Sequence, residues 1–150
     1  MKLFGRIGAS VLAVVLLACA SGAPPIRAAA PAAADAALCR VENFQTFLER
    51  FTDDVEFQMQ HTAPHVQTVQ VDNSGAEPTP VEKVVARADL KFPVIPPSAK
   101  RKQDGLEMTV EPAKRGMKVT LKKPDTDYLI EYTFEHAGCW QLVRRENASL

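Results

Sequence analysis

The last third of the chain alternates apolar and polar residues in four short runs, and this pattern restricts the fold more than any other feature. Because neighbouring side chains of a strand point to opposite faces, the alternation predicts strands with one buried face and one partly wet face. Its apolar residues are Leu106, Met108 and Val110, then Met117, Val119 and Leu121, then Tyr128, Ile130, Tyr132 and Phe134, and finally Trp140 and Leu142. The turns EPAKRG, KKPDT and EHAG separate these runs. We therefore expect four antiparallel strands in a meander.

The residues before this sheet have the periodicity of helices. One apolar stripe, at the spacing of an amphipathic helix, consists of Phe44, Phe47, Leu48, Phe51 and Val55. Asp53, followed three residues later by Glu56, has the spacing of a capping box, so we expect a second short helix to begin there. Pro64 would end the helical region, and the valine-rich run 65–71 predicts a strand. Helices first and strands last predict an α+β domain, with the N-terminal helices packed on the sheet.

The sequence after residue 78 is compatible with either a helix or a strand. The motif TPVE begins at Thr79 and has a capping threonine, a proline in the first helical position and a glutamate three residues after the cap. This order predicts a helix, and valines at helical spacing agree with it. The β-branched side chains make a strand the alternative for residues 83–95. FPVIPP, residues 92–97, is expected to be extended or irregular, because each proline restricts the residue before it.

The first residues have the composition of a signal peptide. Lys2 and Arg6 precede a ten-residue apolar run, residues 9–18. A membrane-spanning helix needs about twenty apolar residues, so this run is too short to be one. We expect residues 1–18 to be a secretory signal peptide.

The sequence LLAC, which ends at Cys19, resembles the lipobox of bacterial lipoproteins. The resemblance implies that Cys19 carries lipid and anchors the mature chain to the membrane. Ala20 stands where an aspartate would retain a lipoprotein in the inner membrane, which implies an outer-membrane protein that faces the periplasm. Ala18, Cys19 and Ala20 also fit ordinary signal peptidase, whose cleavage would release a soluble periplasmic protein.

Residues 19–38 are rich in alanine and proline and predict a flexible tether, which places a single α+β domain at residues 39–150. Cys39 and Cys139 are then the two remaining cysteines, 100 positions apart. In an oxidising compartment they predict one disulfide, and its effect on the unfolded chain would stabilise the domain by about 4–5 kcal/mol. A reactive or metal-binding cysteine pair is the alternative, but no CxxC spacing supports it.

Charge excludes one class of partner. The whole chain has 18 basic and 18 acidic residues, and without residues 1–18 it has 16 basic and 18 acidic residues, a net charge of −2. A nucleic-acid-binding protein needs a positive excess, so we expect no nucleic-acid partner.

Basic residues are nevertheless expected to gather at one end of the sheet. Successive turns of a meander alternate between its two ends, so KRK before the first strand, KK in the second turn and RR after the last strand would meet. The seven residues of this basic patch are Lys100, Arg101, Lys102, Lys122, Lys123, Arg144 and Arg145. The patch would bind an anion, a lipid headgroup or an acidic protein partner. The alternative is a solvated rim mixed with carboxylates, such as Asp104 and Glu146.

Two further groups have the spacing of functional sites. His61 and His65 are four residues apart, like zinc ligands on a helix, but a proline lies between them and His136 is far away in sequence. We therefore expect no metal site, and no pattern predicts a cofactor. Asp53 and Asp54 would suit an acid–base pair, although helix capping explains them as well.

The sequences FQTFLERFTDDVEFQMQHT and YTFEHAGCWQLVRREN resemble a group of bacterial lipoproteins with the nuclear-transport-factor-2-like (NTF2-like) fold, also described as a cystatin-like cone. The resemblance covers about residues 40–147 and rests on core positions, namely Phe44, Phe47, Phe51, Phe57, Phe134 and Trp140. It implies a sheet that curves around the helices and encloses an apolar pocket. Some members are isomerases or dehydratases with Asp and His in that pocket, but no such catalytic pattern can be placed on this sequence.

These observations predict a non-catalytic exported lipoprotein that binds a protein partner or a small apolar ligand in the periplasm. An inhibitor or immunity protein belongs to this class. A small pocket enzyme of the isomerase or hydrolase type is one alternative, and a structural protein of the cell envelope is the other.

Overall fold

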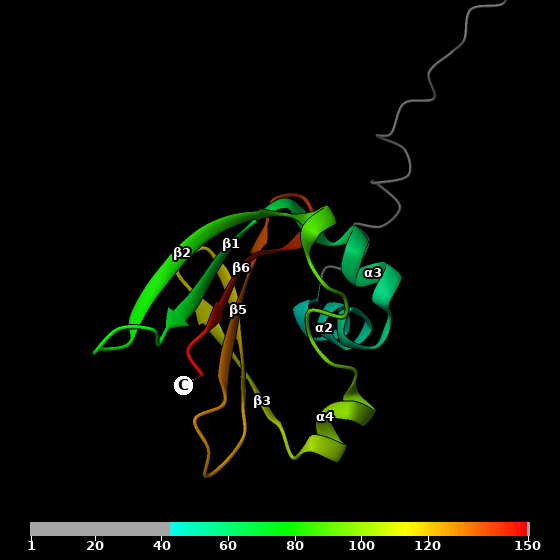
Figure 1. Ribbon diagram of the computed structural model, residues 1–150. Helices are drawn as coiled ribbons and strands as arrows, with labels where there is room; N and C mark the ends of the chain where they lie inside the picture. Colours follow the sequence, from blue (N-terminus) through cyan, green and yellow to red (C-terminus); the bar gives the residue numbers. More distant parts are fainter. Residues whose placement is uncertain (1–42, 150) are drawn as a thin grey trace, which may run out of the picture. The chain divides into compact units, whose positions relative to one another are not determined.

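The computed structural model describes residues 43–149, and its α+β class confirms the prediction. Within this range no helix is both long and apolar enough to cross a membrane. The predicted signal peptide, the lipid attachment at Cys19, the tether and Cys39 lie outside the described residues. In chain order (Figure 1) the elements are α2 (Phe44–Asp53), α3 (Val55–Gln60), β1 (Thr62–Asp72), β2 (Thr79–Ala86), the 3₁₀ helix η1 (Arg87–Asp89), α4 (Ser98–Asp104), β3 (Glu107–Ala113), β4 (Gly116–Lys122), β5 (Leu129–His136) and β6 (Trp140–Asn147).

The strands form one six-stranded sheet in the order β2-β1-β6-β5-β4-β3. From β3 to β6 each strand pairs antiparallel with the next one in the chain. β1 and β2 form an antiparallel hairpin, and β1 lies parallel to β6, which joins the hairpin to the other strands. Figure 1 shows a curved sheet with α2 and α3 against one face. We call this the inner face and the opposite one the outer face.

The core lies between the inner face and the first two helices. The stripe predicted for the first helix is buried there, except Val55, which is 43% exposed. Phe51 and Phe134 meet edge to face with 5.0 Å between ring centroids, an arrangement that stabilises aromatic pairs. Rings from both layers occupy this space: Phe44, Phe47, Phe51, Phe57, Tyr132 and Phe134.

Side-chain caps explain where α2 and α3 begin. Asn43 accepts hydrogen bonds from N–H groups of the first turn of α2, and Asp54 accepts one from the N–H of Phe57 at 3.0 Å. The predicted cap of the second helix at Asp53 is therefore wrong by one residue. Asp53 instead accepts hydrogen bonds from the backbone N–H and the hydroxyl of Ser98, at 2.6 and 3.0 Å, where α4 begins.

The helix predicted from Thr79 is wrong, because these residues form β2. Its β-branched side chains pair with β1, as in Val85 opposite Val66 and Val81 opposite Gln70. The hydrogen bonds of this hairpin outweigh the local capping signal. The strand alternative holds only as far as Ala86, since η1 and an irregular stretch follow.

Pro64 lies inside β1 and does not end the helical region, which already ends at Gln60. Pairing with β2 begins one residue later, at His65, and the register with β6 shifts between Thr62 and Gln67. A proline fits an irregular stretch of this kind because it has no N–H to donate to a neighbouring strand.

Candidate binding groove

A groove of about 510 Å³ lies between β1, β2, β6 and the segment 87–97. Its lining consists of Thr68, Gln70, Lys83, Val85, Asp89, Leu90, Lys91, Pro93, Val94 and Arg145. A second hollow, of about 240 Å³, shares three of these residues and extends toward Asp72. Thr68 is in register with Arg145, and Arg145 with Tyr132, so these side chains share the inner face. The groove volume lies within the range of small-molecule sites, about 300–1,000 Å³.

Gln58 fixes one end of the segment 87–97. This residue is fully buried on α3. Its Nε2 donates to the carbonyl of Ile95 at 2.9 Å, and its Oε1 accepts from the N–H of Val94 at 2.8 Å. The hydroxyl of Tyr132 donates to the carbonyl of Val94, also at 2.8 Å. Because these bonds are buried, they hold Val94 firmly against the groove.

The other end of the segment is held by Arg87. Its Nη1 donates to the carbonyls of Met59 and Thr62, at 3.2 and 3.1 Å. The residues between the two anchors form one wall of the groove. This wall is therefore preformed and does not depend on a ligand for its position.

Arg144 and Arg145 are neighbours in β6 but point to opposite faces of the sheet. Nη2 of Arg144 lies 3.1 Å from a carboxylate oxygen of Glu82 and 3.2 Å from one of Glu146, on the outer face. Arg145 is half-buried and lines the groove. Burial raises the pKa of Tyr132 to about 12, although the nearby guanidinium of Arg145 acts in the opposite direction.

The charge of the groove is mainly positive. Lys83, Lys91 and Arg145 line it together with one carboxylate, that of the exposed Asp89. Apolar side chains form the rest of one wall, and the hydroxyl of Thr68 is committed to the carbonyl of Lys83 at 3.1 Å. Such a surface suits a ligand with both an apolar and a negatively charged part.

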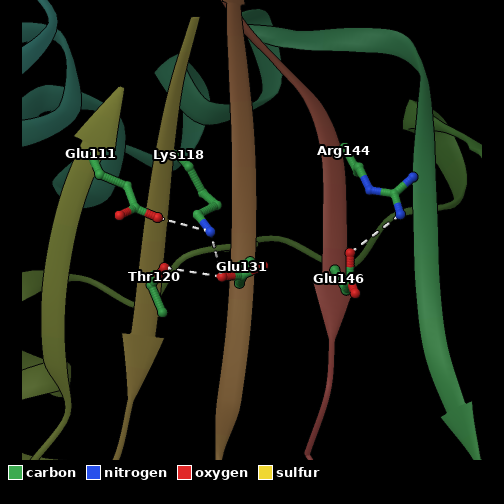
Figure 2. A network of polar contacts seen from close by, with 6 residues as sticks. All are labelled: Glu111, Lys118, Thr120, Glu131, Arg144 and Glu146. Carbon is green, nitrogen blue, oxygen red and sulfur yellow. Dashed lines mark hydrogen bonds and ion pairs between the residues drawn. The ribbon is translucent and has the colours of Figure 1, made fainter. Parts of the chain in front are cut away.

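The outer face carries a ladder of charged side chains that neutralise one another (Figure 2). Nζ of Lys118 lies 2.8 Å from Glu111 and 2.9 Å from Glu131. These two carboxylates raise the pKa of Lys118 well above its ordinary value. Thr120 also donates to Glu131, at 3.5 Å. Exposed ion pairs of this kind contribute little to stability, so the ladder mainly keeps this face polar.

The structure distributes the predicted basic patch over several surfaces. The helical residues lie on α4, a helix that the sequence patterns did not predict: Lys100 pairs with Asp104, and Arg101 donates to the carbonyl of Pro96, both at 2.6 Å. Lys122 lies 3.2 Å from Glu107. The other members are Lys102, which is exposed on α4, Lys123, which lies beside the turn after β4, and the two arginines of β6. Binding of a partner by the whole patch stays a prediction.

The two arginines correct one premise of that patch. Arg144 and Arg145 lie within β6, which runs to Asn147, and not after the last strand. Arg145 shares the groove with Lys83 and Lys91, which no sequence pattern singled out.

The histidines occupy different environments. His61 is 3% exposed, and its ring centroid lies 4.0 Å from that of Phe57. Its Nδ1 donates to the carbonyl of Trp140 at 3.0 Å. Burial lowers the pKa of His61. His65 is exposed on β1, and His136 lies against Trp140 at the end of β5. Residues 43–149 contain no group of three or more His, Cys, Asp or Glu side chains that could hold a metal ion.

Cys139 lies between β5 and β6. Its predicted partner, Cys39, and the predicted lipid attachment site, Cys19, lie outside the described residues. The disulfide and the lipid anchor therefore stay predictions.

Comparison with known proteins supports the fold. No family model matches the chain, and no curated protein matches it. A solved structure, an NTF2-like protein from Bacteroides fragilis, matches with a TM-score of 0.53 and 16% sequence identity. The match covers 73% of this chain and 48% of that one, so this chain spans about half the length of the protein it matches. The described residues thus have an NTF2-like fold.

Proposed function

We propose that this chain is a lipid-anchored binding protein of the bacterial cell envelope, which holds a small, partly apolar ligand in the groove. In this proposal residues 1–18 direct export, Cys19 carries the lipid, and the tether lets the domain reach into the periplasm from the outer membrane. The disulfide between Cys39 and Cys139 stabilises the domain in this oxidising space.

The observation that carries the proposal is the groove itself. It has the volume of a small-molecule site, a preformed wall, and an apolar surface that includes Val85, Leu90 and Val94. Buried polar contacts hold that wall in place, so a ligand would not have to order it. A protein partner that inserts an apolar side chain could use the same surface, and the experiment below distinguishes the two occupants.

A pocket enzyme of the isomerase or hydrolase type would need an acid or base held in the pocket near the substrate. The carboxylate of the groove, Asp89, is exposed, and His61 is buried in the core against Phe57. This arrangement favours binding over acid–base catalysis. A structural envelope protein would have no use for the groove.

The test is native mass spectrometry of the full chain, extracted gently from its own membranes. Val84 and Val85 are neighbours on β2, and they provide a matched pair: Val84 is 71% exposed on the outer face, whereas Val85 lines the groove. We expect the wild type and Val84→Trp to retain a ligand of small mass, and Val85→Trp to lose it, because the indole fills the groove.

Gln70→Trp serves as a second groove-filling variant at an exposed position, in case Val85→Trp does not fold. A bound mass that survives both substitutions, or a wild type without any bound mass, would contradict the proposal. A retained mass of protein size would instead identify a protein partner. The same spectrum tests the anchor, since a lipid-bearing chain begins at Cys19, whereas ordinary cleavage leaves a bare chain that begins at Ser21.

A further inference from the structure

We infer that the groove contains an anion subsite, in which Arg145 binds the oxyanion head of a ligand whose apolar part lies along Val85, Leu90 and Val94. The inference rests on the proposed binding of a ligand in the groove. The head is a carboxylate or a phosphate, since both match the guanidinium fork.

The first support is the contrast between the two arginines of β6. Arg144 has two carboxylate partners on the outer face, Glu82 and Glu146; Figure 2 shows the contact with Glu146. No carboxylate among residues 43–149 forms an ion pair with Arg145, although it is half-buried. A partly buried guanidinium without a carboxylate partner is available to an anionic ligand, with which it forms charge-assisted hydrogen bonds.

The second support is the state of the groups beside Arg145. The hydroxyl of Thr68 donates to the carbonyl of Lys83, and that of Tyr132 donates to the carbonyl of Val94. The hydroxyl oxygen of Tyr132 can therefore only accept from Arg145, and neither hydroxyl supplies a negative charge. Neither hydroxyl therefore neutralises the guanidinium of Arg145.

The third support is the distribution of charge and apolar surface. Lys83 and Lys91 line the same groove and add two further positive charges, and both side chains are exposed. The carboxylate of Asp89 is exposed as well, and that of Asp72, which lines the second hollow together with Lys83, accepts the N–H of Ser74. Val85, Leu90 and Val94 line the groove together with these cations, so the ligand that fits is an amphiphilic anion with a short apolar body.

The experiment compares three eight-carbon ligands by isothermal titration calorimetry: octanoate, octyl phosphate and the neutral octanol. The full chain is held in lipid nanodiscs, and empty nanodiscs give the blank for partition into lipid. The variants are Arg145→Gln and Arg144→Gln, which remove the same charge from neighbouring residues on opposite faces.

We expect at least one of the two anions to bind about tenfold or more tightly than octanol. Arg145→Gln should weaken anion binding by about tenfold or more, the size typical of a charged hydrogen bond. Arg144→Gln should change it less than about twofold, because Arg144 does not face the groove. Tighter binding of octanoate would identify a carboxylate ligand, and tighter binding of octyl phosphate a phosphate ester.

The anion subsite is overturned if octanol binds as tightly as the anions, or if the two arginine variants weaken binding equally. It is also overturned if no anion binds. None of these results decides the proposed function, which depends on the ligand retained in native mass spectrometry and on its loss from Val85→Trp.

Discussion

Replacing Gln58 with leucine tests how the wall of the groove is held. The side chain of Gln58 is fully buried and forms two short hydrogen bonds with the backbone of residues 94 and 95. Leucine has a similar size and no polar atoms, so Gln58→Leu removes these bonds without leaving a large cavity. The N–H of Val94 and the carbonyl of Ile95 would remain buried without this partner.

The magnitude follows from those two groups. A buried polar group that loses its partner costs about 1–3 kcal/mol, and the apolar leucine recovers part of the loss through burial. We therefore expect Gln58→Leu to lower the free energy of unfolding by about 2–4 kcal/mol. That is a large fraction of the roughly 5–15 kcal/mol typical of a domain.

Urea unfolding followed by circular dichroism measures the loss, and Gln60→Leu is the matched control. Gln60 lies two residues away on α3, is exposed, and has only a long contact of 3.5 Å with Glu56. It should change the free energy of unfolding by less than about 0.5 kcal/mol. Amide hydrogen exchange at Val94 should become faster in Gln58→Leu only. A loss below about 1 kcal/mol, or unchanged protection of Val94, would refute the reasoning.

Two other substitutions test the core and the sheet. Burial lowers the pKa of His61 below 6.5, so the unfolded chain binds a proton at this residue more readily than the folded chain does. The free energy of unfolding is therefore fully present above pH 6.5 and falls as the pH drops below that value. His61→Gln should flatten this dependence in urea unfolding at a series of pH values, and an unchanged slope would contradict the assignment. A Cβ at Gly116 would overlap the carbonyl oxygen of Phe134 on β5, so Gly116→Ala should lower the free energy of unfolding by about 1–3 kcal/mol. If Gly116→Ala is as stable as the wild type, this prediction is wrong, because β4 and β5 must then move apart at little cost.

The sequence predicts the elements whose periodicity agrees with their tertiary contacts. The stripe from Phe44 to Phe51 is buried as expected. Three of the alternating runs of the last third form β4 to β6, and their apolar residues lie in the core or are packed against it. The predictions fail where local and tertiary signals differ. TPVE has the capping residues typical of a helix start. It nevertheless forms a strand, because its residues pair with β1 and this pairing outweighs the local preference.

The face of Arg145 could not be predicted from alternation. Counting from the buried Leu142 would place Arg144 on the inner face and Arg145 on the outer one. The register between β5 and β6 shifts at this point, so that Phe134 lies opposite Leu142 but Thr133 opposite Arg144. One extra residue in β6 reverses the alternation. No residue in the sequence of β6 marks the position of this shift.

The location of the groove follows from what fills the rest of the inner face. The phenylalanines of α2 and α3 pack between the helices and the sheet and form the core there. β2 is different, because every one of its residues is exposed or half-buried, and the loop between β1 and β2 lies far from the helices (Figure 1). The groove lies beside this core and uses β2 and the segment that follows it. These are the parts of the chain whose structure the sequence leaves open or misassigns, so the fold was predictable while the candidate site was not.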